Sequence, residues 1–362
     1  MEGQPGMLAA SFQILTSDQV DMAVRQAAAI YVKNRIARAW DSTPNRLGGT
    51  APIPEDDRAA VRGSILSTIA VVPTALRVHI ASSIHSITRY DFPEQWPTLL
   101  DEINKLLAST QEADIYAGVR ALLETVRSFR FADSDTKLEQ VVAATFPQLL
   151  TTTKALLDSP QSQLPAVGEI VYYALKTYKT SMVITLTQHQ QSQDSIVPWG
   201  TVLLRVAQKE LDDASLASDP EAREATSWWK AKKWAFFSLN KLFSRYGIPS
   251  QLAPGMRSYK AFAETFLNNF APEILKAYLQ ICEAALTQQQ WLSRPVTRYM
   301  ILFFQEWYVS SLTQHQTQVD LDAAPPAHAP AHRVVRVPPH VLLGRGRGAL
   351  GARPDRLCAC LG

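Results

Sequence analysis

The chain has 362 residues, of which 46% are hydrophobic and 19% charged, and its formal net charge is +3. No apolar run approaches the roughly 20 residues needed to cross a bilayer, so we expect no membrane span. Three cysteines are too few for a disulfide framework and favour a reducing compartment. Residues 323–362 hold six arginines and one aspartate. The rest is therefore nearly neutral, which argues against direct binding of nucleic acid.

Amphipathic helices are expected almost everywhere before residue 317, because apolar residues recur three and four positions apart. A short helix over 7–15 precedes a longer one over 17–40, and a loop rich in proline and glycine follows at 41–54. Further helices are expected over 54–72, 73–90, 93–108, 113–130, 135–158, 163–187, 194–212, 221–246, 256–287 and 294–316.

An aromatic residue beside a proline recurs in the first helix of several expected pairs. The examples are Phe92-Pro93 with Trp96-Pro97, Phe146-Pro147, Pro198-Trp199 and Phe270-Ala271-Pro272. Pro97, Pro147 and Pro198 are spaced by a period in the range of about 40–50 residues, which is typical of HEAT or armadillo repeats. Chance placement of the prolines is the alternative. We therefore expect an all-α, superhelical solenoid of about six HEAT-like helical pairs, in which each proline kinks its helix.

The helix expected over 228–246 divides into two faces at 100° per residue. One face should pack against neighbours and holds Trp228, Ala231, Ala235, Leu239, Leu242 and Tyr246. The opposing face holds Lys230, Lys233, Phe237, Lys241 and Ser244. We interpret Lys230, Lys233 and Lys241 as a basic stripe on the inner wall, aimed at an acidic partner segment. The alternative is a solvated face whose lysine stems cover apolar surface.

The helix over 17–40 divides in a similar way. One face holds Val20, Ala23, Val24, Ala27, Ala28 and Tyr31. Arg25, Ala29 and Lys33 lie on the other side, one above the next at intervals of four. Here too a solvated surface is the alternative to a binding face.

Three segments resemble a known family. Val24–Ile36 (VRQAAAIYVKNRI) is similar to the opening repeat of importin-β-type receptors. Phe92–Leu100 (FPEQWPTLL) resembles the aromatic-proline segment of the same region. Trp228–Gly247 (WWKAKKWAFFSLNKLFSRYG) resembles a later repeat of the importin-seven and importin-eight branch. On this resemblance the chain is an N-terminal fragment of an importin-β, or karyopherin, nuclear transport receptor.

The resemblance implies partners and a cellular location. Such receptors bind Ran·GTP and the phenylalanine-glycine repeats of nucleoporins, carry protein cargo, and shuttle between cytoplasm and nucleus. The cargo suggested by this branch is basic, such as ribosomal proteins or histones. Inner helices of the early repeats contact Ran in the family, so Arg25, Lys33 and Arg35 are the candidate Ran-binding residues. The family has no catalytic centre, and we expect no enzyme activity, cofactor or metal site.

Three segments are expected along the chain. Residues 1–130 are HEAT repeats like the importin-β N-terminal domain, and 131–322 are further HEAT repeats. Residues 323–362 are a basic tail rich in proline, glycine and arginine, which is either disordered or aberrant, for example translated intron. Two other functions stay open. The chain could be a HEAT scaffold with no transport role, or a non-functional truncation product.

Overall fold

The computed structural model describes residues 4–43, 50–132, 136–211, 213, 215, 218–287 and 290–322. Every regular element within these residues is helical. None of the described helices is both long and apolar enough to cross a bilayer. The tail expected over 323–362 lies outside the described residues.

Six helix pairs make up the described part of the chain, in line with the expected solenoid. They are α1 (Met7–Thr16) with α2 (Met22–Ala39), α4 (Glu55–Val71) with α5 (Thr74–Asp91), α6 (Leu99–Leu107) with α7 (Glu112–Phe129), α8 (Thr136–Asp158) with α9 (Pro165–Ser181), α11 (Gln193–Gln208) with α13 (Ser227–Lys241), and α15 (Ala271–Leu286) with α16 (Arg294–Asp322). The short helices α10 (Gln188–Gln191), α12 (Pro220–Ala225) and α14 (Lys260–Thr265) lie in connections. The pairs form one compact unit that extends to Gln314.

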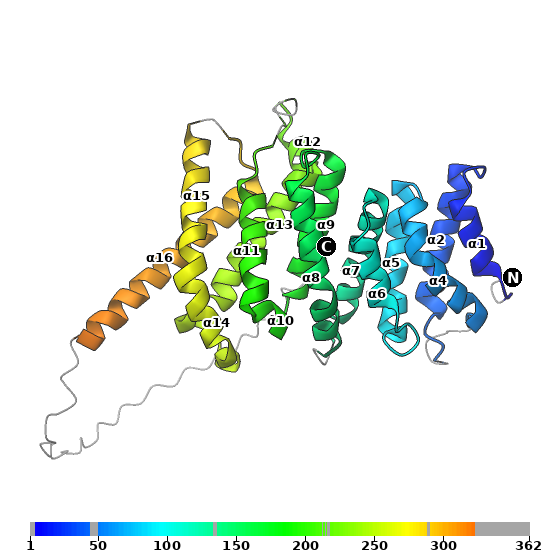
Figure 1. Cartoon of the computed structure of the whole chain (residues 1–362), viewed down its shortest axis with the longest axis horizontal. Coiled ribbons are helices and arrows are strands. Elements are labelled where there is room, and N and C mark those ends of the chain that lie inside the picture. Colours follow the sequence, from blue (N-terminus) through cyan, green and yellow to red (C-terminus); the bar gives the residue numbers. More distant parts are fainter. Residues whose placement is uncertain are drawn as a thin grey trace, which may run out of the picture. The chain divides into compact units, whose positions relative to one another are not determined.

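The paired helices form two layers. The second helices pack on one another in the order α2, α5, α7, α9 and α13. The first helices α6, α8, α11 and α15 likewise pack in sequence. Figure 1 shows these helices standing side by side in chain order from α1 to α15. We call the layer of second helices the inner layer and that of the first helices the outer layer.

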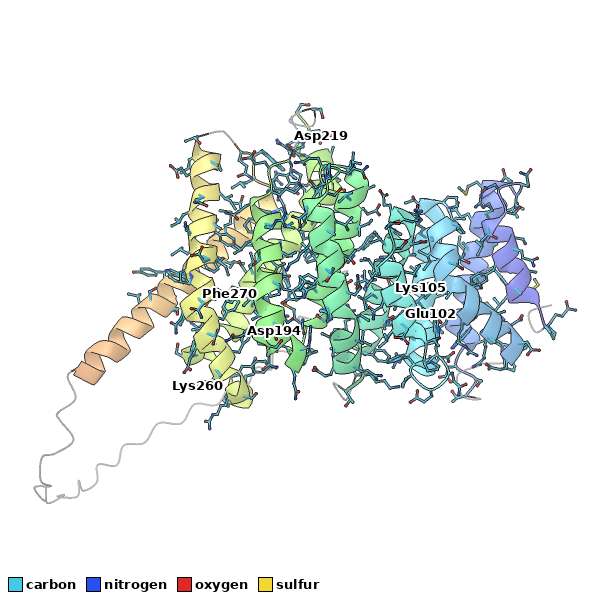
Figure 2. All side chains as sticks on the ribbon, in the orientation of Figure 1. Glu102, Lys105, Asp194, Asp219, Lys260 and Phe270 are labelled. Carbon is cyan, nitrogen blue, oxygen red and sulfur yellow. The ribbon has the colours of Figure 1, made fainter. Side chains whose placement is uncertain are left out.

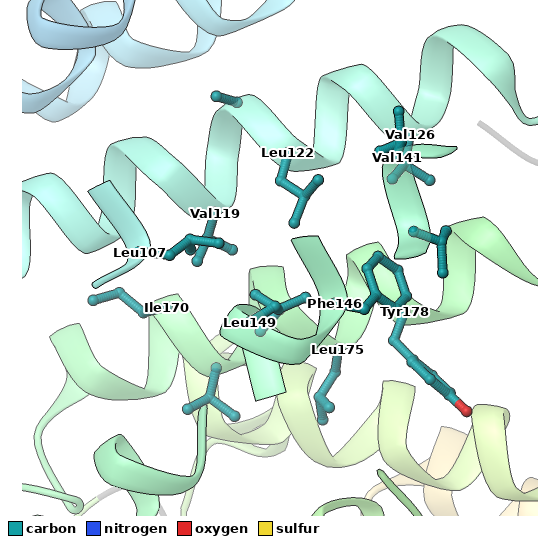
Figure 3. Packing of buried hydrophobic residues seen from close by; sticks show 14 of the residues in the cluster. Leu107, Val119, Leu122, Val126, Val141, Phe146, Leu149, Ile170, Leu175 and Tyr178 are labelled. Carbon is teal, nitrogen blue, oxygen red and sulfur yellow. The ribbon is translucent and has the colours of Figure 1, made fainter. Parts of the chain in front are cut away.

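Aromatic side chains join neighbouring pairs in the core. Tyr178 of α9 and Trp199 of α11 stack with ring centroids 4.5 Å apart, and Phe146 of α8 lies 6.0 Å from the Trp199 ring. Figure 3 shows Phe146 beside Tyr178, with Leu122 and Val126 of α7 above them. All three rings are buried. Because each helix buries its apolar face against its neighbours, a single repeat is not stable alone and depends on the repeats beside it.

Two glycines permit close approaches between neighbouring pairs. A Cβ atom at Gly168 of α9 would lie 2.8 Å from the Trp228 ring of α13. A Cβ atom at Gly200 of α11 would likewise lie 2.8 Å from the ring of Phe270, which Figure 2 labels. Distances this short are incompatible with van der Waals contact, so only glycine fits the observed packing.

Of the four prolines expected to kink helices, two lie inside a helix as predicted and two, Pro97 and Pro272, do not. Pro147 lies inside α8 and Pro198 inside α11. Pro97, however, precedes α6, which begins only at Leu99, and residues 92–95 form a turn. Proline lacks the backbone N–H needed inside a helix, so two prolines four residues apart favour a turn here.

The segment expected as one helix over 256–287 is helical, but it is not a uniform α-helix. A 3₁₀ helix, Pro254–Tyr259, leads into α14, and a π-helical turn, Phe266–Phe270, separates α14 from α15. Pro272 stands at the start of α15, where the missing N–H has no helical partner to lose. Pro272 therefore marks a boundary between two helical segments and does not kink the interior of a helix.

Candidate protein-binding surface

The inner layer carries a group of positively charged side chains from three successive pairs. We call this group the basic cluster; its members are Arg127, Arg130, Lys176, Lys179, Lys233, Lys241 and Arg245. They lie at the C-terminal ends of α7 and α9 and along α13 and the π-helical turn that follows it, Leu242–Tyr246. Parallel packing of α7, α9 and α13 is what gathers these sites, because it places equivalent turns of the three helices side by side.

The members of the basic cluster lie close enough to repel one another. Burial lowers the pKa of Lys179, and the positive charges of Arg130, Lys176, Arg127 and Lys233 lower it further. One acid also adjoins the cluster, since Glu124 pairs with Arg127 at 2.8 Å. An anionic partner would reduce the electrostatic repulsion among these partly buried positive charges.

Aromatic rings lie directly beneath the charges. The Lys179 ammonium lies 4.9 Å from the ring centroid of Trp234 and 5.3 Å from that of Phe237. Lys233 lies 4.8 Å from the Trp234 ring on its own helix. Cations within 6 Å of a ring face are attracted by its quadrupole, by roughly 0.5–1 kcal/mol at exposed sites. The rings thus hold the ammonium groups in place and restrain charges that would otherwise separate.

The pattern of cation over ring continues toward the N-terminus. Arg120 of α7 lies 4.4 Å from the ring of Tyr173 on α9, and Arg77 of α5 lies 4.5 Å from the ring of Tyr116 on α7. Tyr116 and Tyr173 meet edge to face at 5.7 Å. Burial raises the pKa of both phenols, so these tyrosines stay neutral and serve as packing surfaces. Arg120 is also ion-paired with Glu124 at 3.5 Å, and Glu124 is shared with Arg127 of the basic cluster at 2.8 Å.

The two faces predicted for the helix over 228–246 are confirmed. The side expected to pack is buried from Trp228 to Tyr246, and Lys233 and Phe237 on the other side are half-buried. Lys233 and Lys241 belong to the basic cluster, whereas Lys230 is exposed one turn away. Their role as a partner-binding stripe stays a prediction. Sequence analysis missed Lys179 and Arg130, because they come from other repeats and only the packing brings them to α13.

The face prediction for α2 is wrong, since its binding side and its packing side are exchanged. Arg25 and Ala29 are buried, and Val24 is exposed. The Arg25 Nε–H donates a 3.0 Å hydrogen bond to the carbonyl of Leu15, near the C-terminal end of α1, and its Nη1 pairs with Asp18 at 3.2 Å. Helix carbonyls near a C-terminus lack helical partners, and a guanidinium can satisfy one from a buried position.

The other two residues predicted to contact Ran differ in exposure. Arg35 is buried, and its Nη2 donates to the carbonyl of Pro52 at 3.2 Å. Lys33 is half-buried. Of the three candidates, Lys33 is thus the one that the structure leaves at the surface.

An open groove adjoins the basic cluster. It has a volume of about 660 Å³ and lies between α13 with its π-helical turn, the 3₁₀ segment near Met256, and α16. Its lining includes Phe237, Lys241, Arg245, Phe243, Tyr299 and Phe303. The described residues hold no group of three histidine, cysteine, aspartate or glutamate side chains arranged for a metal ion. The basic cluster and the adjoining groove together form the candidate protein-binding surface.

A two-layer array of helix pairs with such a surface defines a HEAT-type α-solenoid. Its fold matches that of the exportin Cse1 in its cargo-free, cytoplasmic state, with a TM-score of 0.64 at 19% identity over 84% of this chain and 31% of Cse1.

Sequence comparison gives the family. Residues 1–71 match the importin-beta N-terminal domain. The chain is 29% identical to importin-8 of Danio rerio, over 84% of its own length and 30% of that relative. It is also 29% identical to nonsense-mediated mRNA decay protein 5 of Saccharomyces cerevisiae, over 85% of this chain and 30% of that relative. The chain thus corresponds to the N-terminal region of the importin-β, or karyopherin, family, which is a family of transport receptors and not of enzymes. It spans about 30% of the length of these relatives.

Proposed function

We propose that this chain is the Ran·GTP-binding N-terminal region of a nuclear import receptor. The observation that carries the proposal is the match of residues 1–71 to the importin-beta N-terminal domain. Similarity to importin-8 over most of the chain supports the import role. On this proposal the receptor also binds phenylalanine-glycine nucleoporins, carries protein cargo and shuttles between cytoplasm and nucleus.

The inner layer of the first pairs is the surface on which Ran would bind. Lys33 of α2 is the predicted contact that remains accessible, and the exposed Arg38 and Arg89 lie toward the ends of α2 and α5. Arg25 and Arg35 would act indirectly, by fixing α2 against α1 and against the loop at Pro52.

The test is the affinity of the full chain for Ran loaded with a non-hydrolysable GTP analogue, measured beside Ran·GDP. We expect clear preference for the GTP form, and Lys33→Glu should weaken that binding about tenfold, or 1.4 kcal/mol. Lys276→Glu on α15 is the matched control, since it reverses an exposed charge in the outer layer. Equal binding to both nucleotide forms by a folded sample would favour a HEAT scaffold without a transport role.

A further inference from the structure

The groove beside α13 and the basic cluster form one continuous surface, because Lys241 and Arg245 belong to both and Phe237 lies beside them. The Phe237 ring lies 5.3 Å from the Lys179 ammonium and 6.0 Å from that of Lys241, and it also lines the groove. On the other side it meets Tyr299 of α16 edge to face at 5.7 Å. Charged and apolar side chains therefore adjoin one another at this edge of the groove.

Two cations that line the groove, Lys241 and Arg245, are held by hydrogen bonds to the preceding repeat. Lys241 Nζ donates to the carbonyl of Val183 at 3.0 Å, and Arg245 Nη2 donates to that of Ile184 at 2.8 Å. A lysine has three N–H donors and an arginine five, so each keeps donors for a ligand. Because both side chains are already ordered, binding an anion there loses little conformational entropy.

The groove itself is mostly apolar, with one acidic side chain. Phe243 and Phe303 are buried at its floor, and Met256 and the exposed Leu302 line it. Glu306 of α16 also faces it. An apolar side chain would thus be the favoured occupant of the groove, while Glu306 opposes the entry of an anion and directs carboxylates toward Lys179 and Lys233.

We propose that this surface binds an acidic peptide segment, whose carboxylates lie over the basic cluster while one large apolar side chain enters the groove. A nucleic acid fits less well for two reasons. The rings at the surface already carry cations of the chain on their faces, so bases cannot stack on them. The groove, moreover, offers apolar area that phosphates do not use. The proposal goes beyond Ran binding, and it assigns a second partner class to the inner layer.

The experiment measures fluorescence anisotropy of a labelled peptide made of glutamates with one central phenylalanine, titrated with the full chain. The combined variant Lys179→Gln, Lys233→Gln should weaken binding about tenfold. Its control, Lys276→Gln with Lys230→Gln, removes two exposed charges that do not belong to the basic cluster and should change affinity less than twofold. Helicity and melting by circular dichroism verify that each variant is folded.

The groove is tested separately. Leu302→Gln should weaken the phenylalanine peptide several-fold and leave a peptide with alanine at that position unchanged. The matched control is Ile301→Gln, which alters an exposed neighbour that does not line this groove. These α16 variants keep the proposal testable if the lysine variants lose stability.

Three results would overturn the proposal. The first is that the control lysine variant loses as much peptide affinity as the Lys179→Gln, Lys233→Gln variant. The second is that the chain binds the phenylalanine and alanine peptides with equal affinity. The third is that it binds single-stranded DNA of the same charge as tightly as the phenylalanine peptide. Failure here is distinct from failure of the proposed function. Peptide binding without preference for Ran·GTP would contradict only the transport role, and the reverse result would contradict only this surface.

Discussion

The indole nitrogen of Trp40 donates a 2.9 Å hydrogen bond to the buried carboxylate of Asp91, which joins the ends of α2 and α5. The other carboxylate oxygen accepts a 2.7 Å hydrogen bond from Arg62 of α4. One side chain thus connects the first two pairs, which include the region that matches the importin-beta N-terminal domain.

Removing this carboxylate should destabilise the N-terminal pairs. Asp91→Ala leaves the Trp40 N–H without an acceptor and removes one of the two carboxylates that pair with Arg62, which keeps Glu55. We expect a loss of about 2–3 kcal/mol in the free energy of unfolding. Asp91→Asn retains an acceptor for Trp40 and should lose about 1.5 kcal/mol. Urea unfolding followed by circular dichroism measures both. Equal midpoints for the alanine variant and the parent chain would show that the contact contributes nothing.

Gly168→Ala tests the close packing of α9 on α13. The new Cβ atom would lie 2.8 Å from the Trp228 ring, and overpacking of this kind costs about 1–3 kcal/mol. Gly63→Ala in α4 is the matched control, because nothing lies within 4 Å of its Cβ position. That change should stabilise the helix by about 0.5–1 kcal/mol. Opposite shifts of the melting temperature are expected, and shifts of the same sign would contradict the packing.

The helices and their pairing followed from the sequence because apolar periodicity reports burial directly. In α13 the period placed Trp228 and Leu239 on the buried side, where they lie. In α2 the same reasoning failed, since it treated Arg25 as a solvent-facing charge. A guanidinium can be buried when it donates to a carbonyl at a helix C-terminus. No local sequence pattern predicts that the Leu15 carbonyl lies within hydrogen-bonding distance of Arg25.

The basic cluster could be predicted only in part. Lys233 and Lys241 share a helix face, which the sequence shows. Lys179 and Arg130 join them through the packing of three helices, and a single sequence does not give that register. The sequence does place these residues near the C-terminal ends of their helices. Basic residues are common there, however, because they interact favourably with the helix dipole, so their position alone does not predict a binding site.

Arg25→Ala separates a structural role from a contact with Ran. Loss of the buried donor to Leu15 leaves that carbonyl without its guanidinium, and we expect a loss of about 1–3 kcal/mol in stability. Lys33→Ala should change stability by less than about 0.5 kcal/mol, because surface substitutions are usually within that range. Thermal unfolding of both variants is the measurement. A larger loss for Lys33 than for Arg25 would reverse the assignment.

Lys232 provides a test of pH dependence. It is buried in α13, its Nζ donates to the carbonyl of Ala207 at 2.9 Å, and burial lowers its pKa to about 7. Asp213 and Glu210 raise this pKa and Lys209 lowers it, but burial dominates. In the unfolded chain the pKa is ordinary, near 10.4. Between these two values the unfolded state binds a proton that the folded state does not, so stability should rise with pH.

The comparison with Lys232→Met isolates this effect. Methionine keeps the length of the stem and removes the charge, so the variant should show a smaller rise in its urea midpoint as the pH increases from about 7 toward 9, below the ordinary tyrosine pKa of about 10. Lys241, whose pKa burial lowers to about 8, contributes a rise of the same sign to both proteins. The difference between the two slopes therefore belongs to Lys232. If stability rose equally with pH in both proteins, the Lys232 ammonium would be solvated in the folded chain.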